Sequence, residues 1–356
     1  MRNCMIVIPV LNPNEAFLPY VEQLIKEQFP FIVIVNDGSS KDKIPIFDEL
    51  SELPEVTVLT HAVNLGKGRA LKNAFNYIMN EPEFVTYDGV ITVDGDGQHE
   101  IDDVIALCRK LEEKNDELVL GVRLFDKENV PWTNRMGNGI TKHLFGLLYG
   151  KKINDTQTGL RGLPADMLSH FVGIEGERYS YETNMLIVAV QSGMALTEIP
   201  IETVYLDDNK ESHFNKVKDS VDIYMLLFKN FFKFISVSLT SFLIDLSFFQ
   251  IFLLVFSFLI KRNQIITATI LARGISSLFN FTLNKKWVFE SDREWKQTFF
   301  SYYALVAVTA IVSGLSVYWL FKLTSIEELV LKIFIDAILF TISYRIQKSL
   351  IFTAKK

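Results

Sequence analysis

The sequence predicts an α/β domain with a mostly parallel sheet, followed by an all-helical membrane domain. Short runs of β-branched and other apolar residues alternate with helical stretches in the first part of the chain, which is typical of a parallel sheet covered by helices on both faces. The second part contains four apolar runs of about 20 residues or more, the length that crosses a bilayer. At 356 residues, of which 49% are hydrophobic, the chain suits two domains better than one.

The charges divide at the same place as the hydrophobicity. From Phe231 onward there are 14 Lys and Arg against 7 Asp and Glu, whereas the residues before it contain 22 against 35. An acidic first part does not suit a nucleic-acid partner, and a hydrophobic, basic second part suits a membrane with anionic headgroups. Cys4 and Cys108 show no metal-ligand spacing, so we expect two buried thiols in a reducing compartment.

Five strands are predicted in the first domain: Met5–Val10, Phe31–Val35, Val56–Thr60, Val90–Val93 and Leu118–Val122. Polar and turn-forming residues follow the first three of them, at Pro9–Asn14, Asn36–Ser39 and Asn64–Gly68. Each of these segments on its own could be a turn or a helix cap. Because ligands of such a sheet bind beyond the carboxyl ends of the strands, polar residues at several strand ends together favour a binding site.

The fourth predicted strand leads into the segment VDGDGQH. Its glycines break the strand, so the carboxylates of Asp94 and Asp96 should emerge together at the strand end, with Gln98 two residues further on. Such hard oxygen ligands suit Mg²⁺ or Mn²⁺ bridging a diphosphate, because these ions take few carboxylates and keep waters or phosphates. A D-x-D triplet alone is weak support and could be an acidic turn.

Four segments, IPVLNPNE, VNDGSSKD, NLGKGRALKNAF and VDGDGQH, resemble in order and spacing the nucleotide-sugar half of family 2 glycosyltransferases, in particular the dolichol-phosphate-mannose and polyprenyl-phosphate-glucose synthases. The resemblance covers roughly residues 4–215 and implies a Rossmann-like GT-A fold. Two departures are visible: Pro13 stands where many members have Glu, and Asn36 precedes Asp37 where many have a second Asp.

The resemblance also implies the residues of the site. Nucleotide-sugar contacts are expected from Pro9, Val10, Asn12, Asn14, Asp37, Gly66, Lys67 and Asp94. The Mg²⁺ or Mn²⁺ ligands are expected to be Asp94, Asp96 and Gln98.

Basic residues beyond the acidic loop suit an acceptor phosphate. Arg123 ends the fifth strand and Arg135 follows, and two guanidinium groups could bind a phosphate bidentately, although a pair of surface arginines is the alternative. The segment NDTQTGLRG resembles the D-x-x-x-G-F/L-R segment of the same family, with Asp155, Thr158 and Arg161 at the matching positions. Glu182 falls on an otherwise apolar helix, where an unpaired carboxylate is costly, so we expect it to meet Arg161 or a sugar hydroxyl. The candidate catalytic residues are Asp96, Arg123, Arg135, Asp155, Arg161 and Glu182.

The predicted domains are residues 1–213, an amphipathic interfacial helix at 214–230, and a membrane domain at 231–356. Its spans are expected at about 231–260, 265–283, 299–321 and 330–351; soluble core helices are the alternative, which four such runs in succession disfavour. The segments LARGISSLFNFTLNKKWVF and DAILFTISYRIQKSLIF resemble the GtrA-like four-helix family, which is associated with polyprenyl-linked sugars in cell-envelope glycosylation.

The basic residues predict the orientation. Lys285, Lys286, Arg293 and Lys296 fall on the same side as the first domain, which indicates a multi-pass protein of the cytoplasmic (inner) membrane with both termini in the cytoplasm. Charged residues also fall within or near the ends of the spans: Asp245, Arg273, Asp336 and Arg345. They are expected to face the bundle, paired with one another or with a polar ligand.

Together these patterns favour an inverting, metal-dependent transfer of a hexose or N-acetylhexosamine. The resemblance implies a UDP- or GDP-sugar as the donor and a polyprenyl (undecaprenyl) phosphate at the cytoplasmic membrane face as the acceptor, for glycosylation of cell-envelope polymers. A processive polysaccharide synthase is one alternative, although no Q-x-x-R-W segment precedes the spans. The other is a translocator of lipid-linked sugars whose first domain only binds. The expected partners include membrane lipids and, through the membrane domain, a second copy of the chain, but no nucleic acid.

Overall fold

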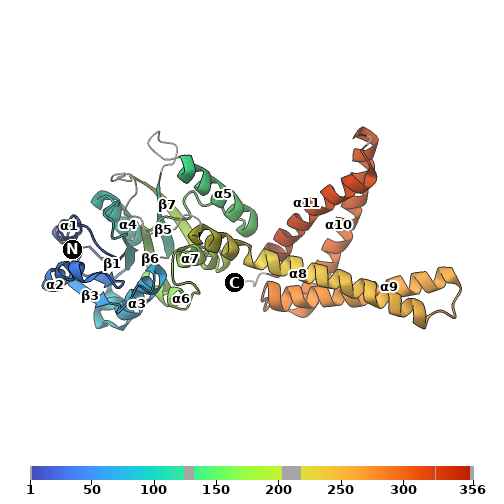
Figure 1. Cartoon of the computed structure of the whole chain (residues 1–356), viewed down its shortest axis with the longest axis horizontal. Coiled ribbons are helices and arrows are strands. Elements are labelled where there is room, and N and C mark those ends of the chain that lie inside the picture. Colours follow the sequence, from blue (N-terminus) through green and yellow to red (C-terminus); the bar gives the residue numbers. More distant parts are fainter. Residues whose placement is uncertain (1, 115, 124–131, 203–217, 325, 353–356) are drawn as a thin grey trace. The chain divides into compact units, whose positions relative to one another are not determined.

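The computed structural model describes residues 2–114, 116–123, 132–202, 218–324 and 326–352 (Figure 1). The chain divides into two compact units, Met1–Leu226 and Leu227–Lys356.

The first unit is built on a seven-stranded sheet with the strand order β3-β2-β1-β4-β6-β5-β7. Its strands are β1 (Cys4–Val10), β2 (Ile32–Asn36), β3 (Val56–Thr60), β4 (Gly89–Thr92), β5 (Glu117–Arg123), β6 (Arg161–Pro164) and β7 (Ala195–Ile201). Strand β6 is antiparallel to both of its neighbours, and the other pairs are parallel. The five strands predicted from apolar runs are confirmed to within about a residue, in a sheet of the GT-A type. Strand β6 was not predicted, because its four residues, RGLP, carry no apolar run.

Helices cover both faces of this sheet. They are α1 (Phe17–Lys26), α2 (Ile44–Ser51), α3 (Lys67–Asn80), α4 (Ile101–Glu113), α5 (Trp132–Tyr149), α6 (Leu168–Val172) and α7 (Ser180–Gln191). Alternate residues of β1, among them Ile6 and Ile8, share a buried core with α1, α2 and α4. Helix α3 packs on β1 and β2 and against α6 and α7. Because both faces are covered, β1 is buried along its whole length, which explains its unbroken apolar run.

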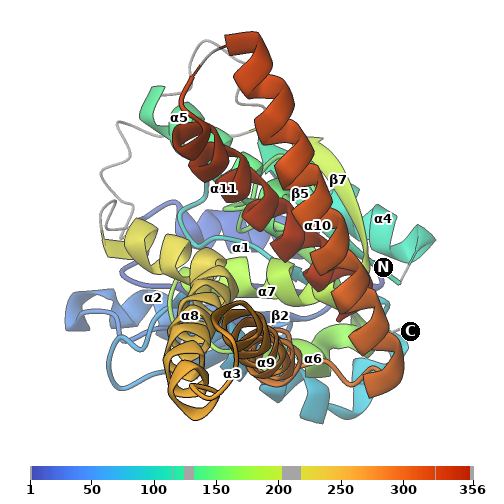
Figure 2. The ribbon, with the colours of Figure 1, turned by 90° about the vertical axis from the view of Figure 1, so that its right-hand side faces the viewer.

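The second unit consists of long helices that pair as two hairpins (Figures 1 and 2). They are α8 (Lys218–Val255, beginning in the first unit), α9 (Lys261–Leu283), α10 (Trp295–Thr324) and α11 (Glu328–Ile346). A π-helical turn ends each hairpin, at Asn284–Val288 and Gln347–Ile351. Three helices of the described residues have the length and composition of membrane spans: Val221–Val255, Lys261–Val288 and Trp295–Thr324. The fourth span, in α11, stays a prediction.

Two predicted boundaries differ from the structure. Helix α8 runs without a break from Lys218, so the described part shows no separate helix ending at residue 230; residues 214–217 lie outside the described residues. The first predicted span extends to residue 260, but α8 ends at Val255. The chain must reverse direction before α9 begins at Lys261, and residues 256–260, all apolar except Ser257, form that turn.

The two hairpins carry identical or chemically similar residues at matching positions. Phe231 and Phe234 of α8 correspond to Phe299 and Tyr302 of α10. From α9 onward the matching pairs are Phe281 with Tyr344, Asn284 with Gln347, Lys285 with Lys348, and Phe289 with Phe352. After each π-helical turn the phenylalanine N–H donates to the carbonyl oxygen of the first residue of the turn, at 3.0 Å in the first hairpin and 2.8 Å in the second.

The matching aromatic residues pack reciprocally between the hairpins. The ring centroid of Phe281 lies 5.5 Å from that of Phe299 and 5.4 Å from that of Tyr302. In the matching arrangement, Tyr344 lies 5.1 Å from Phe231 and 5.3 Å from Phe234. Phe289 stacks on Phe352, with centroids 5.2 Å apart and an interplanar angle of 16°. We call these eight residues the aromatic clasp; each hairpin supplies half of it.

If the clasp joins the hairpins as matched halves, Phe281→Ala and Tyr344→Ala should destabilise the protein similarly. Both side chains are fully buried, and truncating a buried aromatic residue costs about 3–5 kcal/mol. The thermal unfolding midpoint of the purified protein in detergent should therefore fall by several degrees in both variants. Phe258→Ala, at a residue that is 77% exposed, is the control and should leave the midpoint near that of the wild type. A large effect from only one of the two clasp variants would contradict reciprocal packing.

Candidate active site

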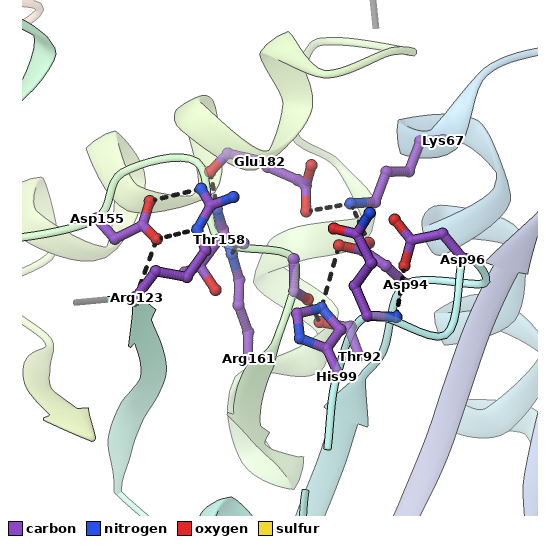
Figure 3. A network of polar contacts seen from close by, with 12 residues as sticks. Lys67, Thr92, Asp94, Asp96, His99, Arg123, Asp155, Thr158, Arg161 and Glu182 are labelled. Carbon is purple, nitrogen blue, oxygen red and sulfur yellow. Dashed lines mark hydrogen bonds and ion pairs between the residues drawn. The ribbon is translucent and has the colours of Figure 1, made fainter. Parts of the chain in front are cut away.

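The acidic loop after β4 lies against the loop that precedes β6 (Figure 3). The Thr92 hydroxyl donates to the Gly159 carbonyl oxygen at 2.7 Å. A Cβ atom added to Gly159 would collide with both carboxylate oxygens of Asp94, so this position requires glycine. Gly95 similarly packs against the Val10 side chain at the end of β1. The structure thus brings the carboxyl ends of the parallel strands β1 and β4 to the same edge of the sheet as the start of the antiparallel strand β6.

Lys67, the first residue of α3, joins two carboxylates. Its Nζ atom lies 2.6 Å from Asp94 Oδ1 and 2.9 Å from Glu182 Oε1. Burial alone would lower the pKa of Lys67, but the two carboxylates raise it. Burial would conversely raise the pKa of Asp94, but Lys67 and the His99 ring, whose Nε2 is 3.2 Å from Oδ2, hold it well below its usual range. Lys67 and Asp94 are therefore both charged at neutral pH.

Asp96 has a different environment from Asp94. Burial and the neighbouring Asp94 carboxylate raise the pKa of Asp96. Its Oδ1 accepts a hydrogen bond of 3.1 Å from the backbone N–H of Gln98. A cation bound between the two carboxylates would relieve their repulsion, so this oxygen-donor set fits Mg²⁺ or Mn²⁺.

The protein ligands do not complete a metal shell by themselves. Among the described residues, the one set of three His, Cys or acidic ligand atoms that converge within 4.8 Å is Cys4, Cys108 and Glu112. Both cysteines are buried, as predicted, and Cys4 is the first residue of β1. An ion at Asp94 and Asp96 would therefore need water and substrate oxygens, which is how Mg²⁺ is usually held.

Asp37 at the end of β2 fixes the loop that carries Lys67. Its carboxylate is almost fully buried and accepts the backbone N–H groups of Leu65 and Gly66, each at 2.8 Å. It also lies 2.7 Å from Nδ1 of His61. Gly66 has φ 101° in the left-handed region, and a Cβ there would collide with the Glu177 backbone. The visible role of Asp37 is thus to position Lys67, and its nucleotide contact stays a prediction.

The first two strand-end loops are tied together at Asn12. Its backbone N–H donates to the Ser39 hydroxyl at 2.9 Å, and its Oδ1 accepts the Ser40 N–H at 2.8 Å. Asn14 Oδ1 accepts the Ala16 N–H just before α1. The predicted nucleotide residues Pro9 to Asn14 therefore form one ordered edge next to the Asp37 loop.

Arg123 at the end of β5 is held by Asp155. Its Nε lies 2.7 Å from Asp155 Oδ2 and its Nη2 lies 3.1 Å from Oδ1, which is a bidentate pair. Asp155 is fully buried, whereas the Arg123 side chain is 27% exposed. Asp155 is therefore a positioning residue that orients the guanidinium. The side chain of Arg135, in the first turn of α5, lies outside the described residues.

Glu182 was expected to meet Arg161 or a sugar hydroxyl, and its carboxylate does not contact the Arg161 side chain. Arg161, fully buried, donates from Nε to the Thr158 carbonyl oxygen at 2.9 Å and from Nη1 to the Glu182 backbone oxygen at 2.7 Å. The Glu182 carboxylate instead reaches Lys67, because the first turn of α7 lies between the two cations. Arg161 thus positions α7, and burial lowers the pKa of its guanidinium.

Sequence reasoning assigned no role to His99, His61 or Gly159, although Gly159 is the glycine of the quoted D-x-x-x-G-F/L-R segment. His99 lay inside the quoted acidic motif, so the motif itself was the available signal. His61 bridges Asp37 and Asn73, whose amide lies 2.8 Å from its Nε2, and nothing in the sequence around this single histidine indicated that.

Two family models match this chain. Residues 5–169 match the family model for glycosyl transferase family 2, and residues 233–352 match that for the GtrA/DPMS transmembrane domain. The uncharacterized protein MJ1222 of Methanocaldococcus jannaschii is 28% identical over 232 residues, which are 64% of this chain and 92% of that protein. The UDP-N-acetylglucosamine–dolichyl-phosphate N-acetylglucosaminyltransferase of Methanococcus voltae is 27% identical over 223 residues, covering 57% and 86%.

A further relative is the dolichyl-phosphate beta-glucosyltransferase ALG5A of Trichomonas vaginalis, 28% identical over 199 residues, which are 54% of this chain and 59% of that protein. The solved structure of mannosyl-3-phosphoglycerate synthase from Rubrobacter xylanophilus aligns with a TM-score of 0.48 and 16% identity, over 64% of this chain and 73% of that one. The chain is a membrane protein that joins a family 2 glycosyltransferase domain of GT-A fold to a GtrA/DPMS transmembrane domain.

Proposed function

We propose that this glycosyltransferase moves a hexose or N-acetylhexosamine from a UDP- or GDP-sugar to the phosphate of a polyprenyl phosphate, with inversion at the sugar. The observation that carries the proposal is the partly buried cluster of Lys67, Asp94 and Glu182, in which the Asp94 carboxylate also raises the pKa of the neighbouring Asp96. It places acidic oxygens for a divalent cation and an ammonium group for phosphate oxygens at one sheet edge. The names of the dolichyl-phosphate relatives support the acceptor class.

The chemistry needs little acid–base assistance. A phosphate monoester is already anionic at neutral pH, so its oxygen can attack the anomeric carbon without a strong base. The bond from that carbon to the diphosphate oxygen breaks, and the nucleoside diphosphate leaves. When bound at Asp94, Asp96 and Gln98, Mg²⁺ or Mn²⁺ supplies charge neutralisation to the departing diphosphate.

The protein residues position the two substrates. Arg123, oriented by Asp155, presents a guanidinium fork to the acceptor phosphate, and Arg135 is proposed to assist it. Lys67 is proposed to bind a donor phosphate. Asp37 positions it by accepting hydrogen bonds from the loop before α3, and Glu182 positions it through an ion pair. Holding attacking and leaving groups in line accounts for a large share of the rate in such transfers.

We also propose that the active site faces the cytoplasm. Four cations lie between the end of α9 and the first turn of α10, namely Lys285, Lys286, Arg293 and Lys296, whereas the opposite end of α9 carries Lys261 and Arg262. This asymmetry puts the α9–α10 loop and both termini inside by the positive-inside rule. Nucleotide sugars and the acceptor phosphate would then meet at the inner membrane face.

Asp96→Ala should reduce sugar transfer at least about 100-fold, because a cation that neutralises the leaving diphosphate loses a direct ligand. The measurement is incorporation of labelled sugar into polyprenyl phosphate by purified protein with Mn²⁺ or Mg²⁺. Asp102→Ala, an exposed carboxylate on α4, is the matched control and should keep wild-type activity. Full activity of the wild type in excess EDTA would contradict the metal assignment.

Arg123→Lys should raise the acceptor KM about tenfold or more while the donor KM stays near that of the wild type. Lysine keeps the positive charge but lacks the planar guanidinium group, which Asp155 orients and which is proposed to bind the acceptor phosphate bidentately. The measurement is initial rate against each substrate in turn. Arg109→Lys, at an exposed arginine of α4, controls for the exchange itself. An increase confined to the donor KM would move Arg123 to the nucleotide side of the site.

The orientation can be tested by cysteine labelling of intact cells, because both native cysteines are buried and give little background. A membrane-impermeant maleimide should label Asn263→Cys, at the α8–α9 end, and should spare Asp292→Cys, before α10. Both positions are exposed, so the control is equal labelling of both in disrupted membranes. The reverse pattern in intact cells would place the active site on the side that lacks nucleotide sugars.

A further inference from the structure

An arginine in the middle of the second membrane helix is largely exposed. Arg273 lies about 18 Å along α9 from the cation at either end, Lys261 or Lys285, at 1.5 Å per residue. Its side chain is 73% exposed, and its Nη2 lies 3.6 Å from Asp245 Oδ2 of α8. A charge at the centre of a membrane helix costs about 2.5–3.5 kcal/mol on insertion scales and normally faces the bundle. Arg273 lies at the middle of the helix, where charged residues usually have a function, but it is not buried inside the helix bundle.

The repeated hairpin shows that packing does not require an arginine here. In the second hairpin, Asp336 of α11 stands at the position that matches Arg273, and Ser313 of α10 matches Asp245. Asp336 is paired inside its own hairpin, with the Ser313 hydroxyl and with Lys332 at 2.8 Å. The two hairpins therefore have the same fold although their matching residues, Arg273 and Asp336, carry opposite charges. Packing alone does not explain why the first hairpin has an arginine at this position.

The surroundings of Arg273 offer room and further polar groups. A Cβ atom added to the adjacent Gly274 would meet no atom within 4 Å. Asp245, the carboxylate beside Arg273, accepts a 2.8 Å hydrogen bond from Ser276 and keeps a partly exposed side chain. An open surface therefore presents a guanidinium and a carboxylate next to each other.

Polar side chains continue from Arg273 towards the Lys285 end of α9. Ser277 contacts the Tyr303 hydroxyl at 2.9 Å, and Asn280 donates to the Ser241 hydroxyl at 3.0 Å. Asn284 donates in turn to Asn280 at 2.7 Å. The spacing of three or four residues keeps this row along one side of the helix.

We propose that Arg273 and Asp245 form a site for the headgroup of a lipid-linked sugar phosphate. The guanidinium binds the phosphodiester through its fork, and the carboxylate accepts hydrogen bonds from sugar hydroxyls. A bare phosphate would meet the repulsion of Asp245 without that compensation, so the pair favours the glycosylated lipid over the unglycosylated acceptor. The site rests on the proposed function only for the identity of the lipid, and it is separate from the residues of the active site.

The test is lipid binding to the full-length protein in detergent, followed by native mass spectrometry without nucleotide sugar. The probes are polyprenyl-phosphate glucose, polyprenyl phosphate and phosphatidylglycerol. Arg273→Gln should weaken binding of the glucosylated lipid about tenfold, which is about 1.4 kcal/mol, and should affect phosphatidylglycerol little. Arg262→Gln, an exposed arginine at the end of the same helix, should bind as the wild type does.

Asp245→Asn tests the sugar contact, since it should reduce the preference for glucosylated over bare polyprenyl phosphate. Arg273→Lys keeps the charge and should retain part of the affinity, which guards against a folding defect in the glutamine variant. Equal binding by Arg273→Gln and wild type, or an equal loss for phosphatidylglycerol, would overturn the site. The binding assay contains no nucleotide sugar, so its outcome does not depend on catalysis. If the wild type fails to transfer sugar in the separate activity assay, the proposed function is refuted, but the binding result still tests the Arg273–Asp245 site.

Discussion

The pairing of Lys67 with Asp94 and Glu182 is the interaction on which the proposed site depends. The side chain of Glu182 is 6% exposed and those of Lys67 and Asp94 are 17% and 27% exposed, so the three charges are largely shielded from water and each depends on its partners. Further hydrogen bonds hold these partners in place. Asp37 accepts one from the loop before Lys67, and Arg161 donates one to the backbone oxygen of Glu182. The loops that follow β2, β3 and β4, the loop before β6 and the start of α7 therefore converge on one charge cluster.

Different forces stabilise the membrane unit, because in a bilayer the hydrophobic effect does not drive its apolar helices to associate. Its hairpins are joined at one end by the aromatic clasp, where shape and ring geometry give directional contacts. Away from the clasp, charged and polar side chains pair within each hairpin, as Asp336 does with Ser313. The clasp is common to both hairpins, whereas the central polar residues differ: Arg273 and Asp245 in the first hairpin correspond to Asp336 and Ser313 in the second.

Much of the fold follows from local sequence pattern. Strand β1 and the membrane-type helices can be predicted from sequence alone, because covered parallel strands and membrane spans both have unbroken apolar sequences. Strand β6 is too short and too rich in Gly and Pro to be seen. The site residues at the strand ends were predictable as a set, but their partners were not: which cation meets Glu182 depends on distances between segments far apart in sequence. The repeat of the hairpins likewise became readable only once contacts showed that Phe281 and Tyr344 occupy matching places.

The measurement that tests the central claim most directly is mass analysis of both products of a single reaction with purified protein, a nucleotide sugar and polyprenyl phosphate. The proposed direct attack by the lipid phosphate, with Arg123 oriented by Asp155, requires a lipid with one phosphate between sugar and polyprenol, together with a nucleoside diphosphate. A diphosphate-linked lipid with a nucleoside monophosphate would show transfer of sugar 1-phosphate, and would contradict the mechanism derived from this site.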